Sequence, residues 1–294
     1  MGENARSTAA FRTATTCRYY DAVSAARNFH AIFPRGARLV FAHRGGAKLA
    51  PENTMAAFDR GLDLGADGIE CDVHLSRDGV AMVIHDATLD RTTNATGPVG
   101  ALTAAELARV DAGYRFSTNG EFPFRGQGVG VSTLEHLLRR HLTRTIIELK
   151  EDGRELARAV VDVIRRTGAV DRVCVGSYHR RALEVMRTEG PEIATSASEP
   201  EARKTLYRSW FRLPPLSEKP YIAFQVPERA GRLKVVSPAF IKQVHAERAA
   251  IQVWVIDGSD DVKRLFSWGV DGVISDRPDI ALAARNEWLT QNPP

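Results

Sequence analysis

The sequence has few cysteines, and they do not form a pattern that would hold a metal or a disulfide framework. Cys17, Cys71 and Cys174 are odd in number and far apart along the chain. Small disulfide-stabilised proteins and structural zinc sites use cysteines at short, paired spacings. The spacing therefore argues against both classes and favours a reducing compartment.

Long apolar runs and clusters of positive charge are also missing. No stretch reaches the roughly 18 apolar residues that a membrane-spanning helix needs, and the first residues lack the apolar core of a secretory signal. The formal net charge is only +4, with 40 Lys and Arg scattered among 36 Asp and Glu. We therefore expect a cytoplasmic protein with no membrane span and no nucleic-acid partner.

From residue 37 onward, short β-rich runs alternate with segments of helical periodicity, and no GxGxxG motif follows an early strand. Residues 65–70 and 269–275 carry the same helix-to-strand connection: a Gly ends the helix, and an Asp-Gly turn leads into the next strand. Such alternation predicts a parallel sheet covered by helices, and about eight strands favour a closed (β/α)8 TIM barrel over an open doubly wound sheet. The predicted strands are 39–43, 68–74, 80–85, 145–149, 172–177, 221–226, 252–256 and 272–276.

Capping sequences mark several helix starts. The stretches TAAE at 103–106 and STLE at 132–135 read as capping boxes, in which a hydroxyl and a carboxylate satisfy free amide groups. Ser237 followed by Pro238 predicts another helix N-terminus. These signals support the alternation of strands and helices.

One strand connection departs from a parallel crossover. Asp78-Gly79 is a tight-turn signal, and the apolar runs on either side lie too close together for a helix to fit between them. The segment therefore predicts a hairpin or a distorted connection. A hairpin would place His85 opposite the region of Glu70.

Unusual polar residues fall where predicted strands end, which is where barrel enzymes carry their catalytic groups. His43 and Arg44 close the first strand. Glu70 and Asp72 are two residues apart, so they share one face of a strand. Glu148 and Lys150 share a face of another strand in the same way. We expect all of these groups at one end of the barrel.

Three carboxylates crowded at a barrel mouth would repel one another and raise their pKa values. A divalent cation removes that cost, and all-oxygen ligation favours Mg²⁺ or Ca²⁺. We therefore predict a metal site, with cationic residues for phosphate oxygens and histidines that exchange protons on either side of phosphorus. Alternatives are structural histidines and a salt-bridged strand face. The predicted residues are Glu70, Asp72 and Glu148 for metal, Arg44 and Lys150 for phosphate, and His43 and His85 for catalysis.

The loop after the first strand carries Gly45 and Gly46 directly behind Arg44. We expect the absent side chains to let a phosphate approach the backbone, while the planar guanidinium holds two of its oxygens. The alternative is that Arg44 pairs with Glu52 and only fixes the loop.

Together these pieces resemble the glycerophosphodiester phosphodiesterase family, which belongs to the phospholipase C-like phosphodiesterases. The matching stretches cover most of residues 39–285 in the family's order. They are HRGG…PENT..AF (43–58), GADGIECDVHLSRDG (65–79), VIHDATLDRTT (83–93), STLEHLL (132–138), IIELK (146–150), VGSYHRRALEVMR (175–187) and VWVIDGSDDVKRLFSWGVDGVISDRPD (253–279).

The resemblance implies an irregular TIM barrel over residues 37–288, with an N-terminal extension at 1–36, a small insertion at about 90–130 and a tail at 289–294. It also implies metal-dependent cleavage of a glycerophosphodiester into glycerol 3-phosphate and an alcohol. Trp254 would be either a substrate platform or a core aromatic residue. Asp257 stands where the family more often has an amide, so we expect an extra carboxylate at the mouth that alters substrate choice or metal affinity.

Three functions remain open. The first is hydrolysis of water-soluble glycerophosphodiesters. The second is a phospholipase D-like reaction on lysophospholipids or sphingolipids, in which the aromatic and cationic segment 205–216 would touch lipid or transiently contact a membrane surface. The third is a catalytically silent phosphodiester-binding protein. A packed loop beside the barrel is the alternative interpretation of 205–216.

Overall fold

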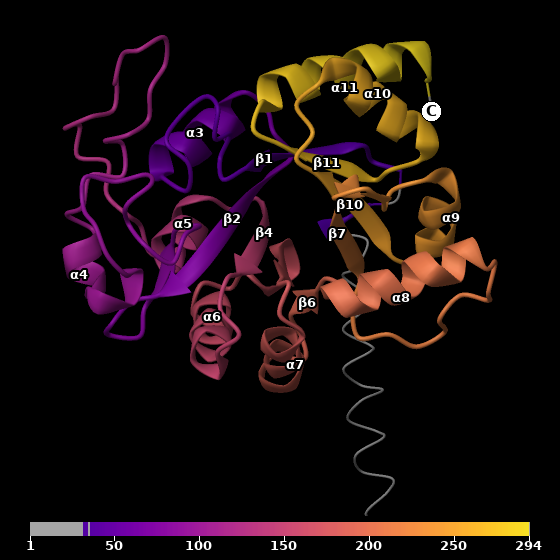
Figure 1. Cartoon of the computed structure of the whole chain (residues 1–294), viewed down its shortest axis with the longest axis horizontal. Helices are drawn as coiled ribbons and strands as arrows, with labels where there is room; N and C mark the ends of the chain where they lie inside the picture. Colours follow the sequence, from indigo (N-terminus) through magenta and orange to yellow (C-terminus); the bar gives the residue numbers. More distant parts are fainter. Residues whose placement is uncertain (1–31, 35, 294) are drawn as a thin grey trace, which may run out of the picture.

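The computed structural model of the chain describes residues 32–34 and 36–293. Within these residues, eight parallel strands form a ring with helices outside it (Figure 1). Around the ring the order is β6, β5, β4, β2, β1, β11, β10 and β7. The predicted (β/α)8 barrel is therefore confirmed. The strands are β1 Leu39–His43, β2 Gly68–Leu75, β4 Arg144–Leu149, β5 Val173–Gly176, β6 Ala194–Thr195, β7 Ala223–Pro227, β10 Ala250–Trp254 and β11 Gly272–Ser275.

The ring is irregular where β6 meets β7. An isolated parallel bridge between Ser196 and Ala223 joins the two strands there. Two hydrogen bonds support the bridge, from Ala197 N to Ala223 O at 2.8 Å and from Ile222 N to Thr195 O at 2.9 Å. The barrel is thus closed, but by a short seam beside the cavity described below.

Helices connect successive strands and cover the outside of the ring. Thr54 and Ser237 cap α3 and α9 with their side-chain oxygens, and Thr103 forms the predicted capping box of α4. The helices are α3 Met55–Asp63, α4 Ala104–Leu107, α5 Leu134–Arg140, α6 Arg154–Arg166, α7 Arg180–Glu189, α8 Glu199–Trp210, α9 Pro238–Ala246, α10 Ser259–Trp268 and α11 Pro278–Gln291, with 3₁₀ turns η2 Val99–Ala101 and η3 Val170–Arg172.

The inside of the barrel is filled by apolar residues below the site. Phe41, Ile146 and Ile274 belong to one buried cluster, and Phe33 contacts Phe41 with the ring centres 6.0 Å apart. Because side chains alternate along a strand, the inward residues that follow Phe41 and Ile146 are His43 and Glu148. The apolar core therefore fixes where the polar end of the barrel begins.

Two predictions about local structure need correction. The run 80–85 is not a barrel strand, because β3 (Ala81–Val83) pairs antiparallel with β2 as the hairpin that Asp78-Gly79 indicated. The eighth barrel strand is instead the two-residue β6, which is too short to produce a periodic signal. In the stretch STLE, Thr133 rather than Ser132 caps α5, since its side chain accepts from His136 N.

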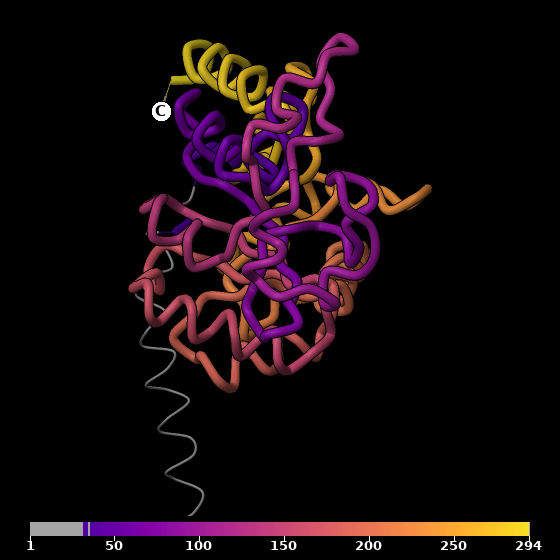
Figure 2. The backbone as a smooth tube through the Cα atoms, turned by 90° about the vertical axis from the view of Figure 1, so that its left-hand side faces the viewer, coloured from indigo at the N-terminus to yellow at the C-terminus, as the bar shows by residue number. Residues whose placement is uncertain are grey.

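Two segments project from the barrel. Figure 2 shows the magenta loop of the segment 113–130 at the top and an orange projection near residue 230 on the right. The orange projection is the antiparallel hairpin of β8 (Arg229–Ala230) and β9 (Leu233–Lys234).

The predicted insertion at 90–130 carries η2 and α4 over a separate small apolar cluster. Most of the predicted extension at 1–36 lies outside the described residues, and α11 ends at Gln291, past the expected boundary at 288.

In the described part of the chain, no helix is both long and apolar enough to cross a bilayer. The cytoplasmic location stays a prediction.

Candidate active site

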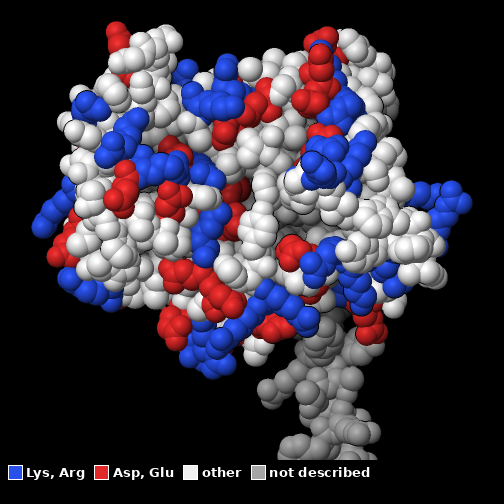
Figure 3. Space-filling model, viewed as in Figure 1, with Lys and Arg blue, Asp and Glu red and all other residues white. Residues whose placement is uncertain are grey.

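The predicted site residues gather at the carboxyl end of β1, β2 and β4. Strand register places His43 beside Glu70, and Asp72 beside Glu148. A cavity of about 480 Å³ opens there, and its polar lining includes six charged or titratable predicted residues, while Asp72 is fully buried. Figure 3 shows acidic atoms in the hollow near the middle of this face, flanked by Lys and Arg. The six are His43, Arg44, Glu70, His85, Glu148 and Lys150; Trp254 also lines the cavity.

Glu70, Asp72 and Glu148 are positioned to hold a cation. Each offers a carboxylate oxygen, and the three oxygens lie within 4.8 Å of one another. Glu148 Oε1 is buried and has no hydrogen-bond partner among the described residues. Burial raises the pKa of Glu70, and the neighbouring Asp72 raises it further. A divalent cation would bind the unpartnered oxygen and relieve the repulsion, so the donor set fits an oxygen-liganded metal.

Asp72 is held ionised by surrounding cations. Lys150 Nζ lies 2.9 Å from Asp72 Oδ1 and 2.8 Å from Glu148 Oε2, and Arg44 Nε lies 3.1 Å from Asp72 Oδ2. Asn53 fixes the carboxylate by donating from Nδ2 at 2.8 Å and accepting from the Asp72 amide at 3.2 Å. Burial alone would raise the pKa of Asp72, but Lys150 and Arg44 outweigh it and lower that pKa.

His43 is oriented from the far end of the chain. Its Nδ1 lies 2.6 Å from Asp276 Oδ1, just after β11, and its Nε2 lies 3.8 Å from Glu70 Oε2. Burial would lower the pKa of His43, yet the hydrogen bond to Asp276 and the charge of Glu70 raise it overall. With Nδ1 in contact with Asp276, Nε2 is the ring nitrogen on the side of Glu70, and His43 lines the cavity.

His85 has a local partner. Its Nδ1 lies 2.6 Å from Oδ1 of the next residue, Asp86. Arg91 donates from Nε to Asp86 Oδ2 at 2.6 Å. Its two Nη atoms donate to the two carboxylate oxygens of Glu52, each at 2.7 Å. Burial raises the pKa of Asp86, but Arg91 and His85 outweigh this and lower it to about 2. The hairpin of β2 and β3 brings His85 to the cavity, as predicted.

Arg44, in the loop after β1, forms the ion pair of one interpretation and also lines the cavity, while its contact with phosphate stays a prediction. Its Nη1 lies 2.9 Å from Glu52 Oε1, so the loop-fixing ion pair is present, yet the residue also lines the cavity. Arg44 has a positive φ of 51°, and its backbone N–H donates to Glu70 Oε2 at 3.1 Å. The left-handed backbone therefore turns an amide toward the carboxylates.

The expectation that Gly45 and Gly46 lack side chains so that a phosphate can approach the backbone is wrong. A Cβ on Gly45 would lie 2.6 Å from the backbone of Ala57 in α3, and one on Gly46 would lie 3.2 Å from the ring of Pro278. Both residues have positive φ, at 86° and 102°. The glycines allow the loop to turn tightly between two helices, and their missing side chains would point at those helices.

Trp254 and Asp257 differ in their relation to the cavity. Trp254 lines it, and its ring centre lies 6.1 Å from that of Tyr178. Asp257 is not among the lining residues; it accepts from the backbone N–H of Asp276 and Arg277, and Lys48 binds its other oxygen at 2.7 Å. The expectation that Asp257 places an extra carboxylate at the mouth is therefore wrong, because Asp257 stabilises the loop that carries Asp276.

Sequence reasoning missed the residues that hold the predicted ones in place. Asp276 follows a strand end and Asp86 follows His85, so the rule used for His43 and Glu70 could have identified both. Asn53 lies within the stretch PENT, whose sequence gives no indication of its bonds to Asp72. The salt-bridged pair Glu52–Arg91 gave no local signal, because its members are 39 residues apart.

Comparison with known proteins agrees with this arrangement. Residues 43–280 match the Glycerophosphoryl diester phosphodiesterase family. The chain belongs to this family. It is 33% identical to the glycerophosphodiester phosphodiesterase of Bacillus altitudinis over 258 residues, which cover 84% of this chain and 98% of that protein.

Solved structures share the fold. The glycerophosphodiester phosphodiesterase of Agrobacterium tumefaciens superposes with a TM-score of 0.67 at 31% identity, covering 84% of this chain and 99% of that one. An Oleispira antarctica phosphodiesterase in complex with the product sn-glycerol-3-phosphate gives a TM-score of 0.68 at 24% identity, covering 88% and 99%. Family membership thus rests on sequence and fold together, and the irregular TIM barrel is the fold of these relatives.

Proposed function

We propose that this chain hydrolyses glycerophosphodiesters to glycerol 3-phosphate and an alcohol, using a divalent cation and histidine acid–base catalysis. The observation that carries the proposal is the cluster of three carboxylate oxygens within 4.8 Å, in the same cavity as His43 and His85. Family membership supports the reaction class. The product bound by the Oleispira antarctica phosphodiesterase suggests glycerol 3-phosphate here.

Glu70, Asp72 and Glu148 would hold the cation, and oxygen ligation favours Mg²⁺ or Ca²⁺. When bound, the cation would polarise a phosphoryl oxygen and offset the charge of the carboxylates. Arg44 and Lys150 would contact the remaining phosphate oxygens, since both cations already face the same carboxylate. Trp254 would lie against the bound diester.

His43 and His85 would act on opposite sides of phosphorus. One removes the proton of the nucleophile, and the other donates a proton to the oxygen of the departing alcohol. The nucleophile that we propose is the glycerol 2-hydroxyl, because an intramolecular attack has a high effective molarity. The 2-oxygen bonds to phosphorus as the bond to the alcohol oxygen breaks. Water then opens the cyclic phosphate to give glycerol 3-phosphate.

A silent phosphodiester-binding protein is less favoured. Each proposed polar role is filled, and two further carboxylates, Asp276 and Asp86, orient the histidines at 2.6 Å. A protein that only binds a diester needs no paired, oriented proton carriers. The filled roles therefore favour an enzyme.

The test is a product assay on glycerophosphocholine with EDTA, Mg²⁺ or Ca²⁺, for the unmodified protein and Glu70→Gln. We expect glycerol 3-phosphate and choline, loss of turnover in EDTA, recovery with one of the cations, and little recovery in the variant. Glu184→Gln, an exposed carboxylate on α7, serves as the matched control. Full turnover in EDTA, or release of phosphocholine and glycerol, would contradict the proposal.

A further inference from the structure

The cavity has two chemically different halves. Its floor carries the charged residues described above, whereas the opposite wall is apolar and includes Leu206, Val226 and Val235, which are at most 8% exposed. The volume of about 480 Å³ falls within the roughly 300–1,000 Å³ of small-molecule sites. In the function proposed above, the phosphate and the glycerol bind at the charged floor, which leaves the apolar half for another part of the substrate.

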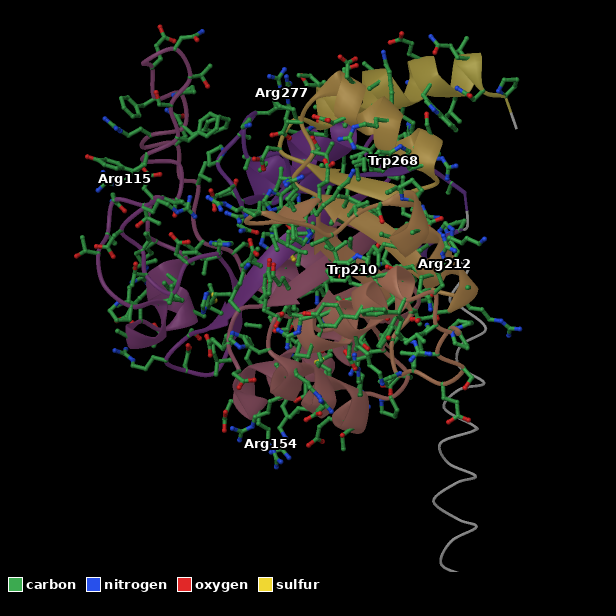
Figure 4. All side chains as sticks on the ribbon, turned by 45° about the vertical axis from the view of Figure 1, so that its right-hand side comes forward. Arg115, Arg154, Trp210, Arg212, Trp268 and Arg277 are labelled. Carbon is green, nitrogen blue, oxygen red and sulfur yellow. The ribbon has the colours of Figure 1, made fainter. Side chains whose placement is uncertain are left out.

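Helix α8 forms one side of the apolar half. Ala202 and Leu206 lie four residues apart on the face that lines the cavity. Trp210 continues this stripe by one more turn, beyond the lining residues. Figure 4 labels Trp210 at the end of α8, with Arg212 just beyond it. The lining face of the helix thus leads from the cavity to an aromatic residue at the surface.

The hairpin of β8 and β9 forms the opposite side, with Ala230 and Leu233 among the lining residues. Helix α10 anchors it: Arg264 binds Glu228 at 3.0 and 2.9 Å, and Lys234 lies 4.7 Å above the ring of Trp268. Trp268 is labelled in Figure 4 beside α10. The hairpin is therefore a fixed wall.

Apolar surface continues outside the cavity along the segment 205–216. Tyr207, Trp210, Phe211 and Leu213 are between 45% and 73% exposed, and the rings of Tyr207 and Trp210 lie 5.2 Å apart. Exposed aromatic residues beside arginines are typical of surfaces that meet lipid. The segment is therefore an exposed lip joined to the apolar wall through α8.

We propose that the apolar half is a subsite for one hydrocarbon chain, so that single-chain phosphodiester amphiphiles of the lysophospholipid class are substrates. The proposal rests on the function proposed above and names its substrate class. Carboxylates and cations bind the phosphate at the floor, while the chain lies between α8 and the hairpin. Three charged residues also line this half of the cavity. Glu199 pairs with Arg203 at 3.1 Å, and Arg229 lies on the exposed strand β8, where water can solvate its guanidinium.

The chemistry of the wall favours a chain over a polar alcohol. Each methylene that leaves water for an apolar surface strengthens binding by about three- to fourfold. A polar alcohol such as choline gains nothing from Leu206, Val226 and Val235. Affinity should therefore rise with chain length until the chain reaches Trp210 and solvent.

The experiment compares glycerophosphocholine with its hexanoyl, octanoyl and decanoyl 1-acyl derivatives below their critical micelle concentrations. The readout is kcat/KM for choline release, and calorimetric binding of octyl- and decylphosphocholine measures the subsite without turnover. We expect both quantities to rise by about three- to fourfold per methylene.

Two variants test where the chain binds. Ala202→Phe fills the apolar half, and Leu233→Glu places a carboxylate on the partly exposed hairpin wall, so each should flatten the dependence on chain length. Lys204→Phe adds the same ring to α8 away from the lining face and should keep the original slope. Thermal unfolding of each variant checks that it is folded.

The outcomes separate the two proposals. Turnover of glycerophosphocholine without any chain-length dependence overturns the subsite and leaves the proposed function standing. Chain-dependent binding without turnover of any diester removes the proposed function, and with it the claim that these amphiphiles are substrates, while the binding subsite stands. A slope that both cavity variants leave unchanged overturns the subsite, because the chain then binds elsewhere.

Discussion

His43 and His85 face the same cavity but depend on different parts of the molecule. The partner of His43 is Asp276, 233 residues away beyond the last strand, whereas the partner of His85 is the adjacent Asp86. The His43 side chain is 14% exposed and that of His85 is 31% exposed. One histidine is thus held by closure of the barrel and the other by a surface loop.

This difference separates two kinds of positioning. β1 pairs with β11, so the first and last strands must come together before His43 meets Asp276. His85 needs only the hairpin of β2 and β3 and the loop with Arg91. Changes near β11 should therefore disturb His43 alone, and changes in the loop after β3 should disturb His85 alone.

The largest expected effect is removal of either histidine. His43→Ala and His85→Ala should each lower kcat by about 10²- to 10⁴-fold, because neither proton transfer has a substitute. The double variant should be little worse than the poorer single one, since both residues serve one reaction. Steady-state kinetics with glycerophosphocholine measures this, with the exposed His136→Ala as control. A variant with near-normal turnover removes that histidine from the mechanism.

Replacing Asp276, the partner of His43, should lower kcat more than replacing Asp86, the partner of His85. Asp276→Asn is expected to lower kcat by about 10- to 1,000-fold, below the loss from removing the histidine itself. Asp86→Asn should cost less, because water can reach the more exposed His85. Loss of the Asp276 carboxylate lowers the pKa of His43, so the limb of the pH–activity profile that reports His43 should move to lower pH. Equal losses and unmoved profiles would remove the distinction between the two histidines.

Arg44→Lys should reduce turnover per folded molecule by about tenfold or more, since Lys lacks the planar fork that holds two phosphate oxygens. The ion pair with Glu52 means that stability should fall as well, by about 2–4 °C in Tm if about 1 kcal/mol is lost. Kinetics and thermal unfolding on the same preparation separate the effects. A destabilised but fully active variant would show that Arg44 only fixes the loop.

Asp257→Asn should have the smallest effect. The amide oxygen can still accept from Asp276 N, and the lost ion pair involves Lys48, which is 58% exposed. We expect unchanged turnover and a change of no more than about 1 kcal/mol in the free energy of unfolding. A large change in metal affinity would support the original expectation that the Asp257 carboxylate acts at the mouth of the barrel.

The sequence predicted the residues that face the cavity better than those that support them. His43, Glu70 and Glu148 occupy inward-facing positions of β1, β2 and β4. The alternation of side chains along a strand, and the location of catalytic groups at the carboxyl ends of barrel strands, were therefore sufficient to predict them. Asp276 became a partner only through the pairing of β1 with β11, which no local pattern reports. β6 has two residues and produced no signal, while the run at 80–85 took its place in the strand count.

Side-chain geometry also separated alternatives that the sequence left open. The Gly-Gly pair suggests access for phosphate, but the direction of the missing Cβ of Gly45 depends on where α3 packs. The position of Asp257 in a motif suggests the mouth of the barrel, whereas its Oδ1 accepts from the backbone of the turn at Asp276 and Arg277. Both errors arose because the position of a residue in the sequence does not say in which direction its side chain points.

The central claim, that the two histidines act on opposite sides of phosphorus, is tested most directly by changing the leaving group. kcat/KM is measured for His43→Ala, His85→Ala and the unmodified protein on glycerophosphocholine and on the nitrophenyl diester of glycerol phosphate. Nitrophenolate leaves without a proton, so the variant that lacks the general acid should recover at least about tenfold on the nitrophenyl diester, and the variant that lacks the base should not. Equal factors of loss on both substrates for both variants would contradict the account.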